Sequence, residues 1–237
     1  MIEFLCCWTI ILDYHMKKYL LLILLLTIVS DMNAQLATAD ELMTIKTRLF
    51  GNKNWKKIAY SISTNGVLDE NRAISYTKII VTPGRTKEEL YNTMRQWIIS
   101  MFSNPDCDIR VMDLENHRII AKGSVRNVAE SDVLWGDGFL VSLNPIVKLE
   151  TKDGRTRINI TIPAYNVHRH IYSTNSDRDE LWNVSSCYPF IPMELDSHSL
   201  TSSKALVMSH VCATRYIEII ESAILNYKPK REERDNW

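Results

Sequence analysis

The chain has 237 residues, with 28 basic and 28 acidic side chains and a hydrophobic content of 46%. A chain of this length and apolar content can bury a core of its own without disulfides or metals to hold it together. Its balanced charge excludes the excess of lysine and arginine that nucleic-acid binders place against phosphates. We therefore expect a globular protein that binds no nucleic acid.

The segment over residues 16–35 has the order of a secretory signal peptide. Two consecutive lysines precede the apolar run Tyr19–Val29, and a short, small and polar stretch follows it. The apolar run is shorter than the roughly 20 residues that a transmembrane helix needs. We therefore take Met16 as the start of the translated protein and expect cleavage after Ala34. An uncleaved N-terminal membrane anchor is the alternative.

The mature chain left by this cleavage is nearly neutral and poor in cysteine. Removing residues 1–34 takes two bases from 28 and three acids from 28, which leaves 26 and 25. The remaining cysteines are Cys107, Cys187 and Cys212, so at most one intramolecular disulfide can form. We expect an exported protein, located in the periplasm or at the outer membrane of a bacterium.

The N-terminal segment of the mature chain, residues 35–57, contains one helical pattern. Apolar residues spaced three and four apart predict a short helix within residues 36–50. A polar break follows, and we expect a single domain over residues 58–228. The charged tail over residues 229–237 is predicted to fray.

The clearest local signals lie between residues 73 and 103. Residues 73–81 are rich in β-branched and aromatic side chains and stop at a Thr-Pro-Gly turn, which predicts a strand. Thr86 and Glu89 form a capping box, so a helix should begin there. Apolar residues at steps of three and four, among them Leu90 and Trp97, predict that this helix buries one broad face.

Four further strands and a long helix complete the predicted domain. Alternation of apolar and polar residues predicts strands over residues 107–112, 117–125, 139–150 and 155–163, the last two joined by an Asp-Gly hairpin turn. We expect residues 163–199 to form an irregular insertion, and residues 200–227 to form an amphipathic helix.

These elements give the order β-α-β-β-β-β-α. Clean alternation indicates strands with one covered face and one wet face, as antiparallel sheets commonly have. Two helices with apolar stripes need a surface to cover, and the sheet offers one. The sequence therefore predicts an α+β fold, a two-layer sandwich with both helices on one face of an antiparallel sheet.

Two segments carry a resemblance to a known family. The stretches Ile74–Ile98, with Leu90-Tyr91 and Trp97, and Glu115–Val125, with its Ile-Ile-Ala-Lys-Gly motif, resemble exported bacterial proteins that share a domain of unknown function. The fold of that family is like that of the TATA-binding protein, which implies the same order of strands and helices. The resemblance supplies no catalytic residue and no cofactor.

Two histidines and one cysteine form the most reactive combination in the sequence. His168 and His170 lie on one side of an extended segment and could share a metal with Cys187 or Asp177. Cys187 could alternatively act as a thiol nucleophile. No second ligand pair and no cysteine-protease signature accompany them, so we expect no metal and no cofactor.

The wet face of the sheet is the stronger candidate for binding. If Ile109, Ala121 and Ile158 point toward the helices, the alternate residues of the same strands point outward. The outward residues that we expect to bind a ligand are Arg110, Lys122, Arg157 and Asn159, accompanied by Thr161. A basic, hydrogen-bonding surface of this kind suits an anionic glycan, lipid headgroup or peptide.

The sequence therefore favours a non-enzymatic binding or structural module of the bacterial cell envelope. Its partner would be an envelope protein, a peptide or a glycan. The alternative is an enzyme acting outside the cytoplasm, a hydrolase centred on His168, His170 and Cys187.

Overall fold

The computed structural model describes residues 40–52, 54–65, 68–102, 107–131, 137–192 and 196–226. The leader predicted over residues 1–34 and the tail predicted over residues 229–237 lie outside these ranges. The chain divides into two compact units, residues 1–44 and residues 45–237. In the first unit, residues 40–44 are described and are helical, as expected; in the second, residues 45–50 are also helical.

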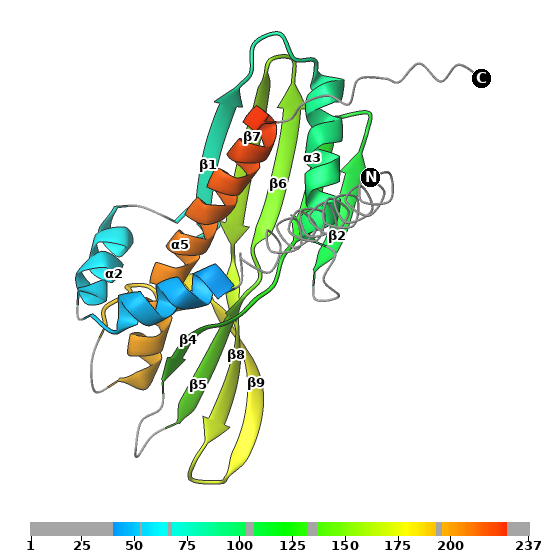
Figure 1. The fold of residues 1–237 in the computed structure, drawn as a ribbon. Helices are drawn as coiled ribbons and strands as arrows, with labels where there is room; N and C mark the ends of the chain where they lie inside the picture. The colour runs from blue at the N-terminus through cyan, green and yellow to red at the C-terminus, as the bar shows by residue number, and fades with distance from the viewer. Residues whose placement is uncertain are drawn as a thin grey trace, which may run out of the picture. The chain divides into compact units, whose positions relative to one another are not determined.

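The second unit contains two antiparallel sheets (Figure 1). Sheet A has the strand order β1-β7-β6-β3-β2, and sheet B has the order β4-β5-β8-β9. The strands of sheet A are β1 (Ile74–Val81), β2 (Asp108–Asp113), β3 (Arg118–Lys122), β6 (Ile146–Lys152) and β7 (Arg155–Ile162). Those of sheet B are β4 (Val125–Ser131), β5 (Gly138–Leu143), β8 (Ala164–Ile171) and β9 (Ser176–Asn183).

Three segments of the chain pass from one sheet into the other. β3 continues into β4, β5 into β6 and β7 into β8, and each passage is interrupted for one or two residues. Pro145 and Pro163 lie in two of these breaks, where a residue without an N–H cannot extend the ladder. Gly123 lies in the third and donates its N–H to the Pro145 carbonyl at 2.8 Å. A Cβ at Gly123 would come within 3.3 Å of the Phe102 and Pro145 side chains, so there is little room for a side chain at this position.

The helices of the second unit are α2 (Trp55–Thr64), α3 (Lys87–Met101), the short α4 (Val184–Cys187) and the long α5 (Ser197–Asn226). α3 begins at the predicted capping box, in which Thr86 accepts from the Glu89 N–H and Glu89 accepts from the Thr86 N–H. In Figure 1, α3 and α5 lie side by side on the same face of sheet A.

The main core lies between those two helices and sheet A. α3 contributes Leu90, Met94 and Trp97, the strands contribute Ile119, Leu149, Ile158 and Ile160, and α5 contributes Ala213, Ile220 and Ile224. The α+β class and the shared face of the two helices are therefore confirmed. Within the described ranges, no helix combines the length and the apolar character that a membrane span requires.

The predicted order β-α-β-β-β-β-α within one sheet is not confirmed, because the described strands form two sheets. Three details of the predicted strands are also wrong. The segment over residues 163–199 is not irregular, because most of it forms the hairpin of β8 and β9. The strand predicted over residues 139–150 is broken into β5 and β6. A bulge between Ile109 and Val111 in β2 reverses the alternation, so Val111 faces the outward Ile120 rather than sharing the inward side with Ile109.

Candidate functional site: the open face of sheet A

Sheet A has one face against α3 and α5, and we call the opposite one the open face. The alternation along β7 decides which side chains reach it. Thr156, Ile158 and Ile160 are fully buried toward the helices, so Arg155 and Arg157 point away from them. The prediction that β7 separates apolar from polar residues in this way is confirmed.

Strand pairing brings charged residues from neighbouring strands into one row with Arg157. Arg157 faces Glu150 of β6, and Glu150 faces Arg118 of β3. On the other side, Arg157 faces Ile79 of the edge strand β1. The row therefore crosses four strands of the sheet, and its one carboxylate lies between two arginines.

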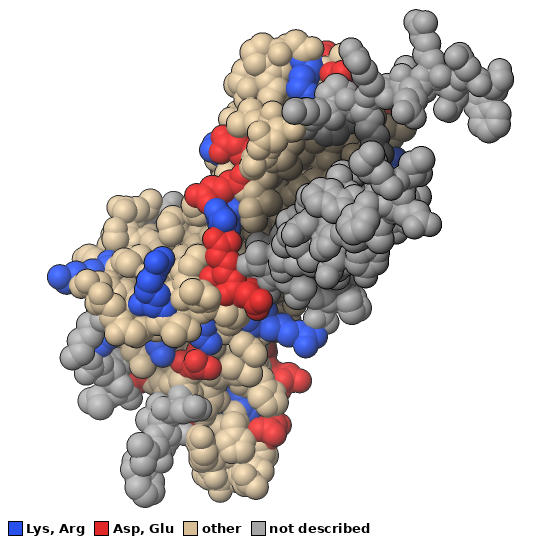
Figure 2. Space-filling view, in the orientation of Figure 1, with Lys and Arg blue, Asp and Glu red and all other residues tan. Residues whose placement is uncertain are grey.

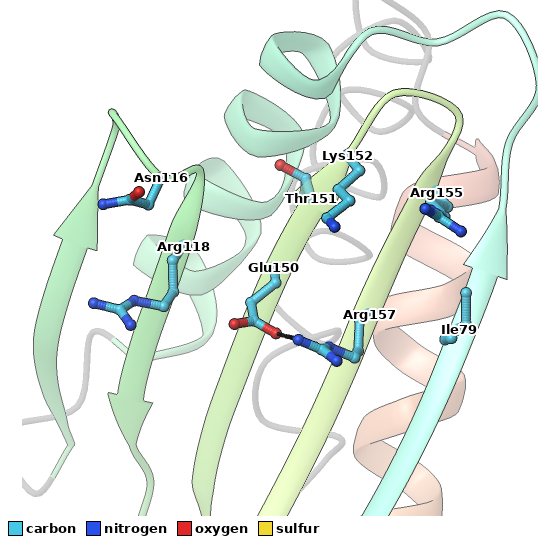
Figure 3. A pocket seen from close by; sticks show the side chains of 8 residues that line it. All are labelled: Ile79, Asn116, Arg118, Glu150, Thr151, Lys152, Arg155 and Arg157. Atoms are coloured by element: carbon cyan, nitrogen blue, oxygen red, sulfur yellow. Dashed lines mark hydrogen bonds and ion pairs between the residues drawn. The ribbon is translucent and has the colours of Figure 1, made fainter.

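A hollow of about 630 Å³ opens around this row (Figure 3). We call it the basic hollow, because four of its lining side chains are cationic and one is anionic. Its lining residues are Ile79, Asn116, Arg118, Glu150, Thr151, Lys152, Arg155 and Arg157. The β6–β7 hairpin, with Asp153 and Gly154 at its turn, places Lys152 and Arg155 opposite each other at one end of the hollow.

Glu150 is the one carboxylate in the lining, and two cations already neutralise it. The Arg157 Nε donates to Glu150 Oε2 at 2.7 Å, and the Lys148 Nζ lies 2.9 Å from Glu150 Oε1. Burial alone would raise the pKa of Glu150, but the hydrogen bonds from Lys148 and Arg157 outweigh it and hold the pKa below its ordinary value. Glu150 therefore stays ionised and fixes the position of Arg157.

The other cations of the basic hollow have fewer partners. The nearest carboxylate to Arg118 is Asp113, 3.6 Å from its Nη2. Hydrogen bonds from Asn116 lower the pKa of Asp113, so that carboxylate is already satisfied by Asn116. Among the described residues, the buried Nε of Arg118 has no hydrogen-bond acceptor. Within the same ranges, Lys152 and Arg155 make no ion pair.

The helix-covered side has a different charge pattern. Figure 2 shows this side, and there red and blue side chains are interspersed. Ion pairs account for several of them, including Lys78 with Glu221 at 2.6 Å and Arg215 with Glu218 at 2.8 Å. The surplus of positive charge in the basic hollow is therefore not a general feature of the surface.

Comparison with known families finds a similarity over the segment that contains the basic hollow. Residues 76–166 match the family model described as a domain of unknown function (DUF4468) with TBP-like fold. The chain is therefore similar to this family over residues 76–166. All the lining residues of the basic hollow fall within the matched segment.

Two crystal structures are similar to the chain. A TBP-like protein from Parabacteroides distasonis is 9% identical, with a TM-score of 0.48, over 68% of this chain and 97% of that one. A DUF4468 family protein from Bacteroides ovatus is 14% identical, with a TM-score of 0.46, over 72% of this chain and 97% of that one. No curated protein matches the chain.

The structure disperses the four predicted ligand-binding residues over the segment that matches the family model. Arg157 lies in the basic hollow. Asn159 is on the open face but donates to Ser75 at 3.3 Å and to Thr77 at 2.9 Å, so its amide ties β7 to β1. Arg110 lies at the bulge of β2, where its Nε is 3.2 Å from Asp108.

Lys122 lies in a separate, more open hollow. This second hollow, of about 980 Å³, follows the outer surface of sheet B and is lined mainly by polar residues of β4, β5 and β8, including Asn127, Ser142 and Asn166. Lys122 and Arg157 both point away from the helices, but they line different hollows, and Arg110 lies at the bulge of β2. That one ligand contacts all three stays a prediction.

Arg118, Lys152 and Arg155 were missed as site residues. Arg155 and Arg157 alternate along one strand, so the sequence contained the signal that both point outward. Arg118 belongs to a strand that is not adjacent to β7, and only the strand order β7-β6-β3 brings it close. That order cannot be read from local alternation.

The combination of His168, His170 and Cys187 does not form a site. Each histidine is hydrogen-bonded to an aspartate across the β8–β9 hairpin, His168 to Asp179 at 2.9 Å and His170 to Asp177 at 2.7 Å. The far end of β9 lies six residue pairs along the ladder from His170, a separation of roughly 20 Å. Cys187 comes after that end. Burial raises the pKa of the Cys187 thiol to about 11, so it is a poor nucleophile at neutral pH.

No part of the described chain brings metal ligands together in the way that the alternative enzyme requires. Groups of three or more His, Cys, Asp or Glu side chains with a suitable arrangement are absent from the described residues. Cys107, Cys187 and Cys212 are free thiols in the structure, and Cys212 is fully buried as a small apolar side chain.

Proposed function

We propose that this protein is a non-enzymatic binding module of the bacterial cell envelope whose basic hollow binds an anionic group, a carboxylate or a phosphate. The observation that carries the proposal is the convergence of Arg118, Arg155, Arg157 and Lys152 on one hollow whose single carboxylate is already neutralised. The signal-peptide pattern of residues 16–35 supports export.

Guanidinium groups suit this role because their N–H donors match the oxygens of carboxylates and phosphates in bidentate pairs. Arg157 is held in place by Glu150, so its remaining donors are oriented before a ligand arrives. The buried Nε of Arg118 has no acceptor within the described part of the chain, and an oxyanion would satisfy it at little cost in further desolvation. Lys152 and Arg155 add positive charge at one end of the basic hollow.

The ligand can carry its oxyanion on a glycan, a lipid headgroup or a peptide, since all three present the same chemistry to the arginines. The source is tested with three probes, namely polygalacturonate, vesicles containing phosphatidylglycerol, and polyglutamate. Binding is measured by titration at low and at physiological salt, because contacts between exposed charges weaken as the Debye length shortens.

The decisive variant is Arg155→Glu, because Arg155 makes no ion pair among the described residues and its loss leaves the fold intact. The matched control is Arg95→Glu, the same charge change at an exposed position of α3 on the helix-covered side. We expect Arg155→Glu to weaken binding of at least one probe roughly tenfold, the equivalent of one charged hydrogen bond. Equal loss in both variants, or no binding of any probe, would contradict the proposal.

A further inference from the structure

Each of the two sheets has two edge strands, and three of these four edges carry features that discourage pairing with another chain. β4 has a bulge between Val125 and Ala129, and two lysine side chains donate to its carbonyls: Lys46 to Asn127 at 2.7 Å and Lys204 to Glu130 at 2.9 Å. Bulges and edge lysines are the usual means by which proteins protect a sheet edge.

The edges β2 and β9 are protected in similar ways. β2 is bulged between Ile109 and Val111 and carries charged side chains at Asp108 and Arg110. β9 contains the run Asp177-Arg178-Asp179-Glu180 and is therefore charged on both faces. Neither strand offers an apolar strip to a neighbour.

The fourth edge, β1, has none of these features. All eight of its residues pair with β7 without a shift in register. Its one charged side chain, Lys78, is neutralised by Glu221 of α5 at 2.6 Å. On the open face its side chains are uncharged, and two of them are apolar and solvent-exposed: Ile79 is 56% and Val81 is 66% exposed.

We propose that β1 pairs with β1 of a second copy of this chain, antiparallel across a twofold axis. The edge suits a second copy because its outer strip is uncharged and β-branched, and such residues pair favourably across strands. The whole chain also has no net charge, so two copies do not repel each other at long range. Two five-stranded sheets would thereby join into one continuous sheet.

The sequence of β1 selects the register. If Lys78 faced the partner's Lys78, like charges would meet on one face, which is unfavourable. Sliding the partner strand by two residues places Ile79 opposite the partner's Ile79 and Thr77 opposite the partner's Val81, so the exposed apolar side chains cover one another. This register also leaves the Ile74 end free, where Leu68 already pairs with the edge.

The arrangement of the surrounding elements leaves room for such a partner. In Figure 1, α2 lies near the end where β1 begins, away from Val81. Ile79 also lines the basic hollow at its β1 side (Figure 3), so the partner's strand would lie next to that side. The dimer would present two basic hollows on one continuous face, which suits a ligand that repeats its anionic group. The pairing itself does not depend on the ligand.

The test is the oligomeric state of the full mature chain, measured by analytical ultracentrifugation over a wide concentration range. We expect a reversible dimer, and we expect Val81→Lys to weaken it roughly tenfold or more because it places an unpaired charge in the new strand pair. Val81 does not line the basic hollow but faces Arg155 across β1 and β7, so probe binding is measured on the same variant, and a weaker dimer with undiminished probe binding separates dimerisation from ligand binding. The control is Ile99→Lys, at an exposed apolar position of α3 that is 47% exposed.

A second variant tests the register. Ile79→Cys should form a disulfide-linked dimer under mild oxidation, because facing residues of antiparallel strands have neighbouring Cβ atoms. Ile99→Cys should not. A chain that is monomeric at every concentration would overturn the proposal, as would a dimer that Val81→Lys leaves unchanged or that Ile79→Cys does not cross-link.

Discussion

Sheets A and B share three segments of chain that continue from one sheet into the other, yet different interactions hold the two sheets together. The inner face of sheet A is aliphatic, and residues such as Ile119, Leu149 and Ile158 are almost completely buried under α3 and α5. Burial of apolar area stabilises this half without requiring any particular partner for each side chain.

The outer half of sheet B depends on specific polar pairs. Arg169 bonds Asp137 and also Glu180, at 3.1 Å, and its guanidinium lies 5.6 Å from the ring centre of Phe139. Phe139 in turn packs edge-on against Trp182, with ring centres 5.0 Å apart. The comparison teaches that one continuing segment can owe its strand structure to apolar alternation in sheet A and to individual polar side-chain pairs in sheet B.

The largest expected effect is on sheet A. Ile158→Ala removes a fully buried side chain and leaves a cavity under the helices, so we expect the free energy of unfolding to fall by about 2–5 kcal/mol. Urea denaturation measures it. Ile79→Ala, on the open face of the same sheet, is the control and should change stability little. If both variants lost the same amount, apolar burial would not be what holds sheet A.

The junction between the sheets should show the next largest effect. Gly123→Ala adds a Cβ within 3.3 Å of Phe102 and Pro145, and overpacking of this kind costs about 1–3 kcal/mol. Since the crossing strands belong to both sheets, hydrogen exchange should accelerate in β3, β4 and β6 together. Ser124→Ala, at the adjacent residue, is the control. Acceleration confined to one sheet would show that the two halves open independently.

A smaller and more local effect is expected from Arg169→Ala. This change removes the cation that contacts Asp137 and leaves Glu180 with the more distant Arg178, but Arg169 is one-third exposed, so we expect a loss of about 1–2 kcal/mol. Amides of β5, β8 and β9 should exchange faster while those of sheet A stay protected. Arg178→Ala, an exposed position 3.9 Å from Glu180, should have less effect. Equal effects would mean that the Arg169 pairs contribute nothing beyond ordinary surface charge.

The same contrast explains what the sequence could predict. The strands of sheet A and both long helices followed from periodicity, because burial of one face leaves an alternating or three-and-four pattern. β8 begins with alternating apolar residues, but His168, Arg169 and His170 interrupt that pattern, and β9 is almost entirely polar. The pairing of β8 with β9 can be recognised only in the structure, where the charged residues of one strand lie opposite their partners on the other.

The candidate site was predictable only in part, for a related reason. Alternation showed that Arg157 points outward, but which cations surround it depends on strand order. The bulge in β2 depends on one extra residue and leaves no local signature at Arg110. Local patterns therefore identified the face but not the members of the basic hollow.

The smallest expected effect concerns pH and the β8–β9 hairpin. The hydrogen bond to Asp179 raises the pKa of His168, and the hydrogen bond from His170 lowers the pKa of Asp177. A raised histidine pKa stabilises the fold below the unfolded value, near 6.5, and this contribution is lost as the pH rises through the folded pKa. A lowered aspartate pKa stabilises above the unfolded value, near 3.9, and this contribution is lost as the pH falls through the folded pKa.

The two contributions therefore overlap between about pH 4 and pH 6.5, and the hairpin should be best protected there. Amide exchange in β8 and β9, corrected for the intrinsic effect of pH, should accelerate as the pH rises above about 6.5, through the raised pKa of His168. His168→Gln should remove most of that dependence, whereas β6 and β7 should show none of it in either protein. Because these side chains are exposed, the change should be confined to the hairpin. A pH dependence shared equally by β6 and β7 would show that both halves of the continuing strands open as one unit.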